Sequence, residues 1–255
     1  MINDYHLFGK SALVTGASRS IGIGAAVAHG LASMGVNVFT TYYRPFDGAA
    51  GGQEEAGALL DELRAAGVKA GGLEADLADI AAPEAIFALA ERAVGPVDIL
   101  VNNAAHDYPC DIYALTPALL DAHYQVNVRG TALLCAEFAR RHDGRPGGRV
   151  INLTSGQSID PMETNLPYAM TKGAVEVLTK ALSVSLKTKS ITVNAVDPGG
   201  TDTGWMTPEL IAGIKTNALH NRVGVPQDAT RLILFLASAQ AEWITGQVLH
   251  SRGGL

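Results

Sequence analysis

Short apolar runs alternate along the chain with longer segments in which apolar residues recur at helical spacing. The runs rich in Val, Ile and Leu occupy residues 11–14, 36–41, 98–102, 149–153, 191–196 and 247–250. The segments with helical spacing occupy residues 24–34, 53–66, 82–94, 117–141, 168–187 and 227–238. A continuous apolar run between two helices is typical of a parallel strand that is buried on both faces. The pattern therefore predicts a series of βαβ units.

Such a series predicts an α/β fold with a doubly wound parallel sheet and helices on both of its faces. A weaker strand is predicted at 69–75, because helical segments precede and follow it. A (β/α)8 barrel is the alternative that a chain of 255 residues also allows. No Pro/Gly/Ser-rich linker divides the chain, and the Gly/Ala-rich stretch 48–52 is predicted to be a loop. Residues 1–255 are therefore predicted to form a single domain.

Composition narrows the class of protein. Lys and Arg number 19 against 25 Asp and Glu, so the net charge of −6 argues against nucleic acid as a partner. No run approaches the ~20 apolar residues of a membrane span, and no basic leader precedes the first strand, so we expect neither membrane insertion nor secretion. Two cysteines suit a reducing, cytoplasmic location. No metal site is predicted.

The chain holds 28 glycines, and several of them follow the first predicted strand. Residues 15–24 read Thr-Gly-Ala-Ser-Arg-Ser-Ile-Gly-Ile-Gly, and a helical segment begins directly after them. A glycine turn between a strand and a helix presents backbone N–H groups and the helix dipole to an anion such as a pyrophosphate. A turn of this kind also serves as an ordinary connection, so the loop alone does not identify a site.

A possible acid–base pair begins the helical segment 168–187. Tyr168 and Lys172 are four residues apart, which places both side chains on one helix face. A unit charge about 4 Å away is worth roughly 4 kcal/mol at an effective dielectric of about 20. This interaction would lower a tyrosine pKa of about 10 to about 7. The pair therefore predicts a phenol that acts as general acid or base near neutral pH.

Together these motifs resemble the short-chain dehydrogenase/reductase family, from about residue 9 to residue 254. Ser155 precedes Tyr168 by thirteen residues, as in the family, and Asn127 lies in a similar helix. The resemblance implies a Rossmann-type sheet of about seven strands and four catalytic residues. Tyr168 would exchange the proton, Ser155 would orient the substrate oxygen, and Lys172 would lower the Tyr168 pKa and hold the nicotinamide ribose. Asn127 would hold a water that relays protons to Lys172.

The glycine loop departs from the family pattern T-G-x-x-x-G-x-G, because Ser20 stands at the position of the second glycine. Either Ser20 replaces that glycine, or Ser20 and Ile21 are inserted and Gly22-Ile23-Gly24 forms the family's G-I-G. The spacing from Gly24 to Gly35 and the apolar stripe of the following helix favour the insertion. Some bacterial members similar to 3-oxoacyl-carrier-protein reductases have this longer loop.

The resemblance also implies a nicotinamide cofactor. The acidic residue that favours NAD is absent, because its position holds Tyr42. Arg19 and Arg44 are placed to neutralise a 2′-phosphate, so NADP(H) is the predicted cofactor; the alternative is that both arginines are simply solvated. The residues expected at the cofactor are Gly16, Ser18, Arg19, Gly22, Ile23, Gly24, Tyr43, Arg44, Asp76, Leu77, Asn103, Ala104, Tyr168, Lys172, Pro198, Gly199, Thr201 and Thr203. Two further departures are Ala105 in place of a glycine and Arg252 in place of an aspartate.

The predicted reaction is NADP(H)-dependent hydride transfer with a small carbonyl or alcohol substrate, as in ketone or 3-oxoacyl reduction. Imine or enoyl reduction and non-catalytic NADP(H) sensing remain alternatives, whereas a serine hydrolase lacks its G-x-S-x-G motif. A substrate lid is expected near 204–222, where an apolar stripe either walls the pocket or packs the lid. The resemblance implies a homotetramer, or a homodimer, formed through 117–141 and 168–187.

Overall fold

A computed structural model describes residues 5–47 and 52–254, so most of the stretch 48–52 lies outside the described residues. Seven parallel strands form one open sheet in the order β3-β2-β1-β4-β5-β6-β7. The strands are β1 Ser11–Val14, β2 Asn37–Tyr42, β3 Ala70–Glu74, β4 Ile99–Asn102, β5 Gly148–Leu153, β6 Ile191–Asp197 and β7 Val248–His250. The doubly wound sheet and the strand predicted at 69–75 are confirmed, and the barrel is excluded.

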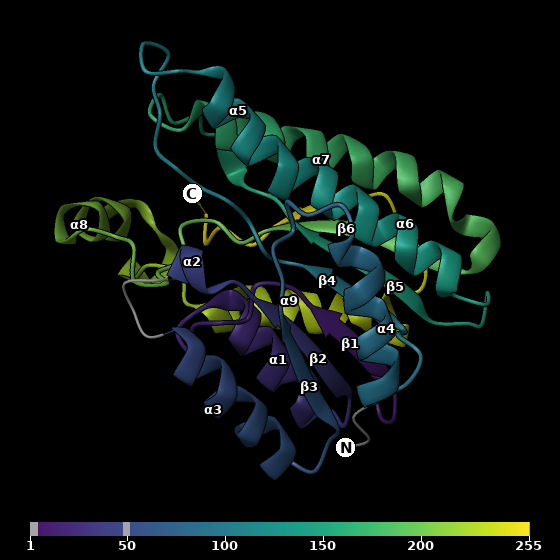
Figure 1. The fold of residues 1–255 in the computed structure, drawn as a ribbon. Coiled ribbons are helices and arrows are strands. Elements are labelled where there is room, and N and C mark those ends of the chain that lie inside the picture. The colour runs from purple at the N-terminus through teal and green to yellow at the C-terminus, as the bar shows by residue number, and fades with distance from the viewer. Residues whose placement is uncertain (1–4, 48–51, 255) are drawn as a thin grey trace.

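Helices cover both faces of the sheet (Figure 1). They are α1 Ile23–Ser33, α2 Arg44–Asp47, α3 Gly52–Ala65, α4 Ala82–Val94, α5 Pro117–His123, α6 Thr131–Arg141, α7 Leu166–Ser185, α8 Pro208–Asn217 and α9 Pro226–Ala237. One hydrophobic cluster joins α1, α3 and α9 to one face, and a second joins α4, α6 and α7 to the other. Because both faces are covered, all four residues of β1 are buried, as the continuous apolar runs indicated.

The segment 117–141 differs from the single α-helix that its periodicity predicts. Between α5 and α6 the chain makes π-helical turns over Tyr124–Gly130 (η1) without interrupting the helical rod. Asn127 lies in this stretch, and π-helical insertions occur frequently at functional sites. At its end, a Cβ on Gly130 would lie 2.9 Å from the backbone oxygen of Leu77, so glycine allows η1 to approach the loop after β3 closely.

The strand order reverses direction between β1 and β4, which makes the carboxyl ends of these two strands the topological switch point of the sheet. Loops after β1, β2, β3, β4, β5 and β6 carry most of the candidate residues from Gly16 to Thr203, and the others lie on η1, on α7 and at the starts of α1 and α2. Parallel strands bring all of these loops to one edge. Within the described residues, no helix is both long enough and apolar enough to cross a membrane.

Candidate active site

The loop after β1 is tied to the end of β4. The backbone N–H groups of Asn103 and Ala104 donate to Thr15 Oγ1 at 3.0 and 3.1 Å. In return, the side-chain amide of Asn103 donates to the carbonyl oxygens of Thr15 and Gly16 at 3.0 and 2.9 Å. These four hydrogen bonds hold the glycine loop in place at the switch point.

Glycines allow this loop to pass close to its neighbours. Gly16 has φ +69°, and a Cβ there would lie 2.7 Å from Ala104 Cα. A Cβ on Gly24 would collide with the carbonyl oxygen of Gly16 and lie 2.7 Å from Asn103 Nδ2. Helix α1 begins at Ile23 with no side-chain cap and no acidic residue in its first turn. Its first N–H groups are therefore free of a competing carboxylate of their own helix, and this donor set fits a diphosphate.

Ser20 and Ile21, the two residues interpreted as an insertion, contact other elements. The backbone N–H of Ser20 donates to the Glu55 carboxylate of α3 at 2.7 Å. The side chain of Ile21 covers Gly204, where an added Cβ would lie 2.7 Å from Ile21 Cδ1. The lengthened loop thus joins α3 to the start of the predicted lid, which no sequence pattern indicated.

The two arginines expected at a 2′-phosphate have different surroundings. Arg44, at the start of α2, forms an ion pair with Glu74 at the end of β3, and its backbone N–H also donates to Glu74. The half-buried Arg19 has no ion-pair partner in the described part of the chain. In this structure Arg19 is therefore free to meet a phosphate, whereas Arg44 is already neutralised.

The adenine end of the predicted site lies after β2 and β3. Asp76 accepts the backbone N–H of Ala78 at 2.8 Å, which holds its carboxylate at the end of the loop. Burial and the nearby Asp76 carboxylate raise the pKa of Tyr43, so its phenol remains a hydrogen-bond donor. The structure therefore brings Tyr43 and Asp76 together, and Leu77 lies beside η1.

Tyr168 and Lys172 share one face near the start of α7. Lys172 Nζ lies 5.3 Å from the centroid of the Tyr168 ring and donates to the carbonyl oxygen of Leu153, at the end of β5, at 2.7 Å. Lys172 is only 4% exposed. Burial lowers the pKa of Lys172 to about 8, against the opposing effect of the Asp107 carboxylate. The helical spacing therefore brings the two side chains together as expected.

The expected lowering of the Tyr168 pKa is wrong. Burial raises the pKa of Tyr168 above its ordinary value, and the carboxylates of Asp107 and Asp197 raise it further. A spacing of four residues shows which side chains meet, but it contains no information about desolvation or about carboxylates from distant loops. Tyr168 is consequently protonated at neutral pH, which is the form that donates a proton.

Ser155 follows β5 in an extended conformation, directly before the 3-10 turn Gly156–Ser158 (η2). The residues around it are anchored to α7. Thr154 and Ser158 both donate to Glu176 Oε1, at 3.0 and 3.3 Å, and Thr154 also donates to the carbonyl oxygen of Lys172. The backbone carrying Ser155 is thus held against the same helix that carries Tyr168.

Asn127 is buried, and its side chain is occupied. Its oxygen accepts the N–H of His106 at 2.7 Å, and its nitrogen donates to the carbonyl oxygen of His106 and to Thr171 Oγ1 at 2.9 and 3.0 Å. The structure therefore gives the Asn127 side chain two partners, neither of which is Lys172. Through these bonds Asn127 joins the loop after β4 to the first turns of α7, where Tyr168 and Lys172 also lie.

The loop after β6 supplies the residues expected at the nicotinamide. Thr201 is buried, and its hydroxyl donates to the carbonyl oxygen of Pro198 at 2.8 Å. Thr203 is half-buried beside the start of the predicted lid. The Thr201 hydroxyl is thus used to shape the loop, and Thr203 is the less constrained of the two threonines.

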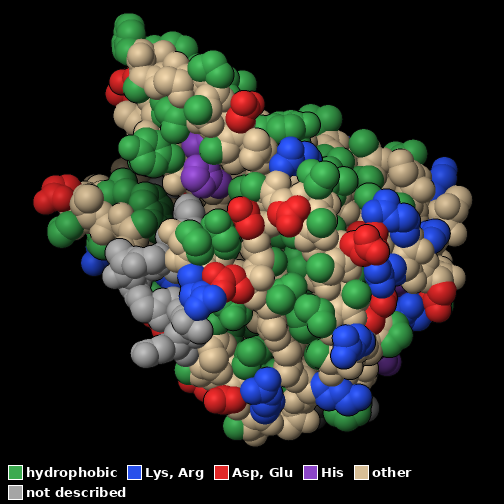
Figure 2. All heavy atoms as spheres, in the orientation of Figure 1, with side chains coloured by type: hydrophobic (Ala, Val, Ile, Leu, Met, Phe, Trp, Pro, Cys, Tyr) green, Lys and Arg blue, Asp and Glu red, His purple; other side chains and the backbone are tan. Residues whose placement is uncertain are grey.

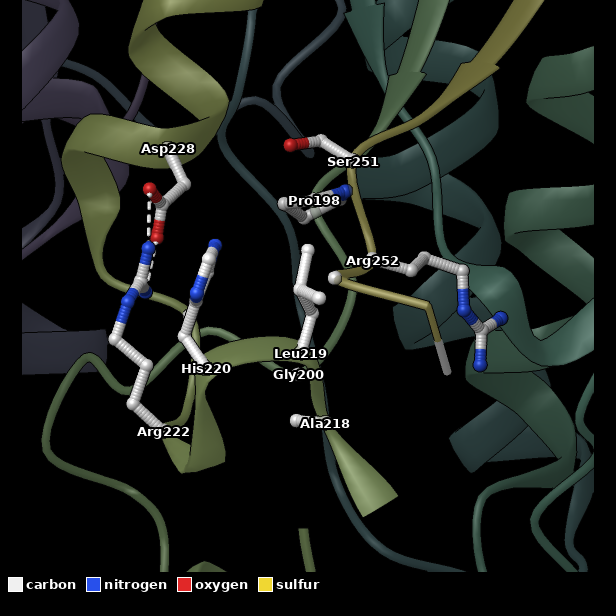
Figure 3. A pocket seen from close by; sticks show the side chains of 11 residues that line it. Pro198, Gly200, Ala218, Leu219, His220, Arg222, Asp228, Ser251 and Arg252 are labelled. Atoms are coloured by element: carbon white, nitrogen blue, oxygen red, sulfur yellow. Dashed lines mark hydrogen bonds and ion pairs between the residues drawn. The ribbon is translucent and has the colours of Figure 1, made fainter. Parts of the chain in front are cut away.

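A cavity of about 220 Å³ lies between this loop, the 3-10 turn Leu219–Asn221 (η4) and the C-terminal tail (Figure 3). Arg222 and Asp228 form an ion pair at its edge. Helix α8, which precedes this turn in the chain, carries the apolar stripe of the predicted lid. A Cβ on Gly200 would lie 3.2 Å from Ile214 Cδ1 and 3.8 Å from Met206 Cε, so this part of the stripe faces the loop after β6.

The structure places several further residues beside the candidate site, at the carboxyl edge of the sheet, that were not identified from the sequence. Asp197 is buried beneath the loop after β6 and contacts both His250 and Arg252. Glu55 and Glu74 reach candidate cofactor residues from α3 and β3, through the contacts with Ser20 and Arg44. In the sequence, Arg252 was notable only as a departure from the family pattern. No sequence pattern indicated the carboxylates of Asp197, Glu55 and Glu74, because their partners lie far away in sequence.

Known proteins resemble this chain over nearly its whole length. Residues 16–255 match the family model described as enoyl-(acyl carrier protein) reductase. The uncharacterized oxidoreductase YjdA of Bacillus subtilis is 43% identical over 247 residues, which is 96% of each chain. An NADPH-dependent aldehyde reductase-like chloroplastic protein of Arabidopsis thaliana is 35% identical over 261 residues, with 97% of this chain and 94% of the relative covered.

The solved structures agree with this likeness. A short-chain dehydrogenase from Burkholderia cenocepacia in complex with NADP is 33% identical, with a TM-score of 0.87 and coverage of 97% of this chain and 98% of that one. The family model, the relatives and the fold therefore agree. This chain is an oxidoreductase that belongs to the short-chain dehydrogenase/reductase family.

Proposed function

We propose that the protein is an NADP(H)-dependent carbonyl reductase. The observation that carries this proposal is the pairing of Tyr168, whose raised pKa keeps it protonated, with the buried Lys172 at the edge where the glycine loop lies. When bound there, NADPH supplies the hydride. Tyr168 donates its proton to the substrate oxygen, and the Ser155 hydroxyl hydrogen-bonds to that oxygen and orients it. Lys172 and Asn127 hold the surrounding helix and loop in position.

The preference for NADP(H) is supported by charge at the ribose end of the site. Tyr42 leaves the end of β2 without a carboxylate, and Arg19 has no ion-pair partner in residues 5–47 and 52–254. An arginine recognises a phosphate through several N–H groups at once. The Arabidopsis relative is named as NADPH-dependent, and the Burkholderia neighbour was solved in complex with NADP, which also supports this preference. We expect Arg19, Ser18 and the glycine loop to bind the phosphates.

The substrate is placed between Tyr168, Ser155 and the lid, for which we propose residues 204–222. The half-buried apolar stripe of α8 and the preceding Met206 favours a substrate with an apolar part. Enoyl reduction is the second candidate, because the matching family model carries that description. A panel of aldehydes, ketones, 3-oxoacyl thioesters, enoyl thioesters and imines, each offered with NADPH, separates the two reactions.

The Tyr168→Phe variant tests the assigned proton donor. We expect loss of at least about 100-fold in kcat for carbonyl reduction, because the proton donor is removed. The affinity for NADPH, measured by fluorescence titration, should stay within about twofold. Tyr113→Phe is the matched control, since Tyr113 is fully exposed in the loop before α5. Turnover of Tyr168→Phe near that of the wild type would overturn the assignment.

A further inference from the structure

The C-terminal tail, residues 251–254, connects three parts of the catalytic edge. The backbone N–H of Ser251 donates to the carbonyl oxygen of Asp197, at the end of β6, at 2.8 Å. Arg252 Nη1 donates to the carbonyl oxygen of Gly156, in the turn after Ser155, at 2.9 Å. The carbonyl oxygen of Gly253 accepts the N–H of Leu219, in the turn after α8, at 2.7 Å.

Arg252 is the buried centre of these contacts. Its side chain is 11% exposed, and Nη1 lies 3.7 Å from the carboxylate of Asp197, whose side chain is 1% exposed. The other Asp197 contacts are the N–H of Gly199 and the ring of His250, both at 2.9 Å. A buried carboxylate that loses its cation is strongly destabilised, so Asp197 holds the guanidinium firmly. Asp160, which is exposed, adds a weaker contact at 3.4 Å.

The guanidinium fills the space beside Gly156. A Cβ on Gly156 would overlap Arg252 Nη1 and would lie 2.7 Å from the Asp197 carboxylate. Figure 3 shows the Arg252 side chain directed away from the cavity that Leu219 and Pro198 line. The carbonyl oxygen of Gly156 also accepts the N–H groups of Ile159 and Asp160, both at 2.9 Å, so Arg252 adds a third donor to the oxygen that organises this turn.

From this geometry we infer that Arg252 is a positioning residue for Ser155, and that the tail couples the Ser155 turn to the base of the lid. The inference rests on the proposed function only in that Ser155 is taken to contact the substrate oxygen. Asp197 fixes the guanidinium, the guanidinium fixes Gly156, and the adjacent Ser155 is thereby held in register with Tyr168. On the other side of Arg252, Gly253 holds the first residue of the turn after α8.

The first test replaces the guanidinium. We expect Arg252→Ala to lower kcat for carbonyl reduction about 10- to 100-fold, because a displacement of about 1 Å at a reacting group has that effect. The Kd for NADPH should change less than about threefold. Arg252→Lys should recover about tenfold of the lost kcat, since an ammonium can still donate to Gly156 and pair with Asp197. Equal kcat in Arg252→Ala and the wild type would overturn the inference.

Arg64→Gln is the matched control for this test. Arg64 also donates to a backbone carbonyl, that of Ala70, and also pairs with an aspartate, Asp61, but it lies at the end of α3 remote from the carboxyl edge of the sheet. We expect its kcat to equal that of the wild type. An equal loss of kcat in both variants would show a general effect of removing an arginine and would contradict a role at Ser155.

A second test uses the close approach at Gly156. Gly156→Ala should lower kcat strongly in the wild-type background, because the new methyl group displaces the guanidinium. In the Arg252→Ala background the clash with the guanidinium is gone and only the close approach to the Asp197 carboxylate remains, so the two effects should combine to less than their product. Strictly multiplicative losses would contradict the proposed contact between the two residues.

A third test does not depend on activity. In Arg252→Ala, the amide hydrogens of Ile159, Asp160 and Leu219 should exchange at least about threefold faster, because the turn and the lid base lose a common anchor. Unchanged exchange would refute the coupling even in an inactive preparation. Faster exchange without any reductase activity in the wild type would instead leave the coupling standing and refute the proposed function.

Discussion

At the scale of single residues, burial shifts the pKa values of the two candidate catalytic residues on α7. Lys172 and Tyr168 meet as their spacing predicts, yet burial shifts both pKa values toward the neutral form, so that of Lys172 falls to about 8 and that of Tyr168 rises. Charged groups lose hydration when they are buried, and this loss exceeds the attraction that a helical pair alone would provide. The raised pKa keeps Tyr168 protonated at neutral pH, as the proposed role of proton donor requires.

The lowered pKa of Lys172 predicts a pH dependence of stability. Between pH 8 and about 10.4, the unfolded lysine keeps a proton that the folded one has lost, so raising the pH favours the folded state. The free energy of unfolding of the wild type, minus that of Lys172→Met, should rise by at most about 3 kcal/mol over this interval and stay constant below about pH 7.

Urea unfolding at several pH values between 7 and 10 measures this difference. Lys180→Met, at an exposed position two turns along the same helix, is the control and should show no such rise. A difference between wild type and Lys172→Met that stays flat from pH 8 to pH 10 would contradict the lowered pKa.

At the scale of elements, the pairing of adjacent strands determines which residue Arg44 contacts. Tyr42 and Glu74 are direct partners in the register of β2 and β3, so Glu74 lies beside Arg44 although 30 residues separate them. The glycine loop shows the same effect, because Ser20 reaches Glu55 on α3 and Ile21 reaches Gly204 at the start of the predicted lid. Neither contact can be read from the local sequence.

The pairing of Arg44 with Glu74 predicts how cofactor affinity can be changed. Glu74→Gln should release the guanidinium and lower the Kd for NADPH about three- to tenfold, because the arginine then meets the 2′-phosphate instead of a carboxylate. The Kd for NADH, which lacks that phosphate, should not change. Fluorescence titration measures both, with Asp61→Asn as a control that removes an exposed carboxylate elsewhere. Weaker NADPH binding by Glu74→Gln would contradict a phosphate-binding role for Arg44.

At the scale of the whole molecule, one surface of α7 carries apolar side chains that the described residues leave exposed. Val177, Ala181 and Val184 are exposed, and Met170 extends the same side of the helix. Figure 2 shows hydrophobic side chains along the upper edge of the molecule, over α5 and α7. Such a surface favours burial against another copy, which supports the proposed homotetramer or homodimer.

Light scattering at micromolar concentration tests this assembly. We expect a wild-type mass of two or four chains, and a smaller assembly for Val177→Asp, because a charge would be buried in the interface. Ile80→Asp is the control, since Ile80 is equally exposed in the loop before α4 and should leave the mass unchanged. A monomeric wild type would refute the proposed oligomer.

The sequence alone was sufficient for the plan of the fold. β1 has the predicted bounds, and 36–41 differs from Asn37–Tyr42 by one residue, because apolar runs and helical stripes report burial directly. The glycine loop and the Tyr168–Lys172 pair were also identifiable, since their geometry depends on near neighbours. The π-helical turns at Asn127 were not, because their periodicity differs too little from that of an α-helix.

Contacts between distant segments were decided only by the tertiary structure. Asp197 and Arg252 form an ion pair although they are 55 positions apart in the sequence, and Glu74 neutralises Arg44. Burial raises the pKa of Tyr168, whereas the sequence predicted that it would be lowered. Local sequence encodes which face of an element is buried, because that choice repeats with the period of the helix or strand. Which charges share a buried site depends on how the strand ends are brought together, and desolvation then determines the protonation state of each group.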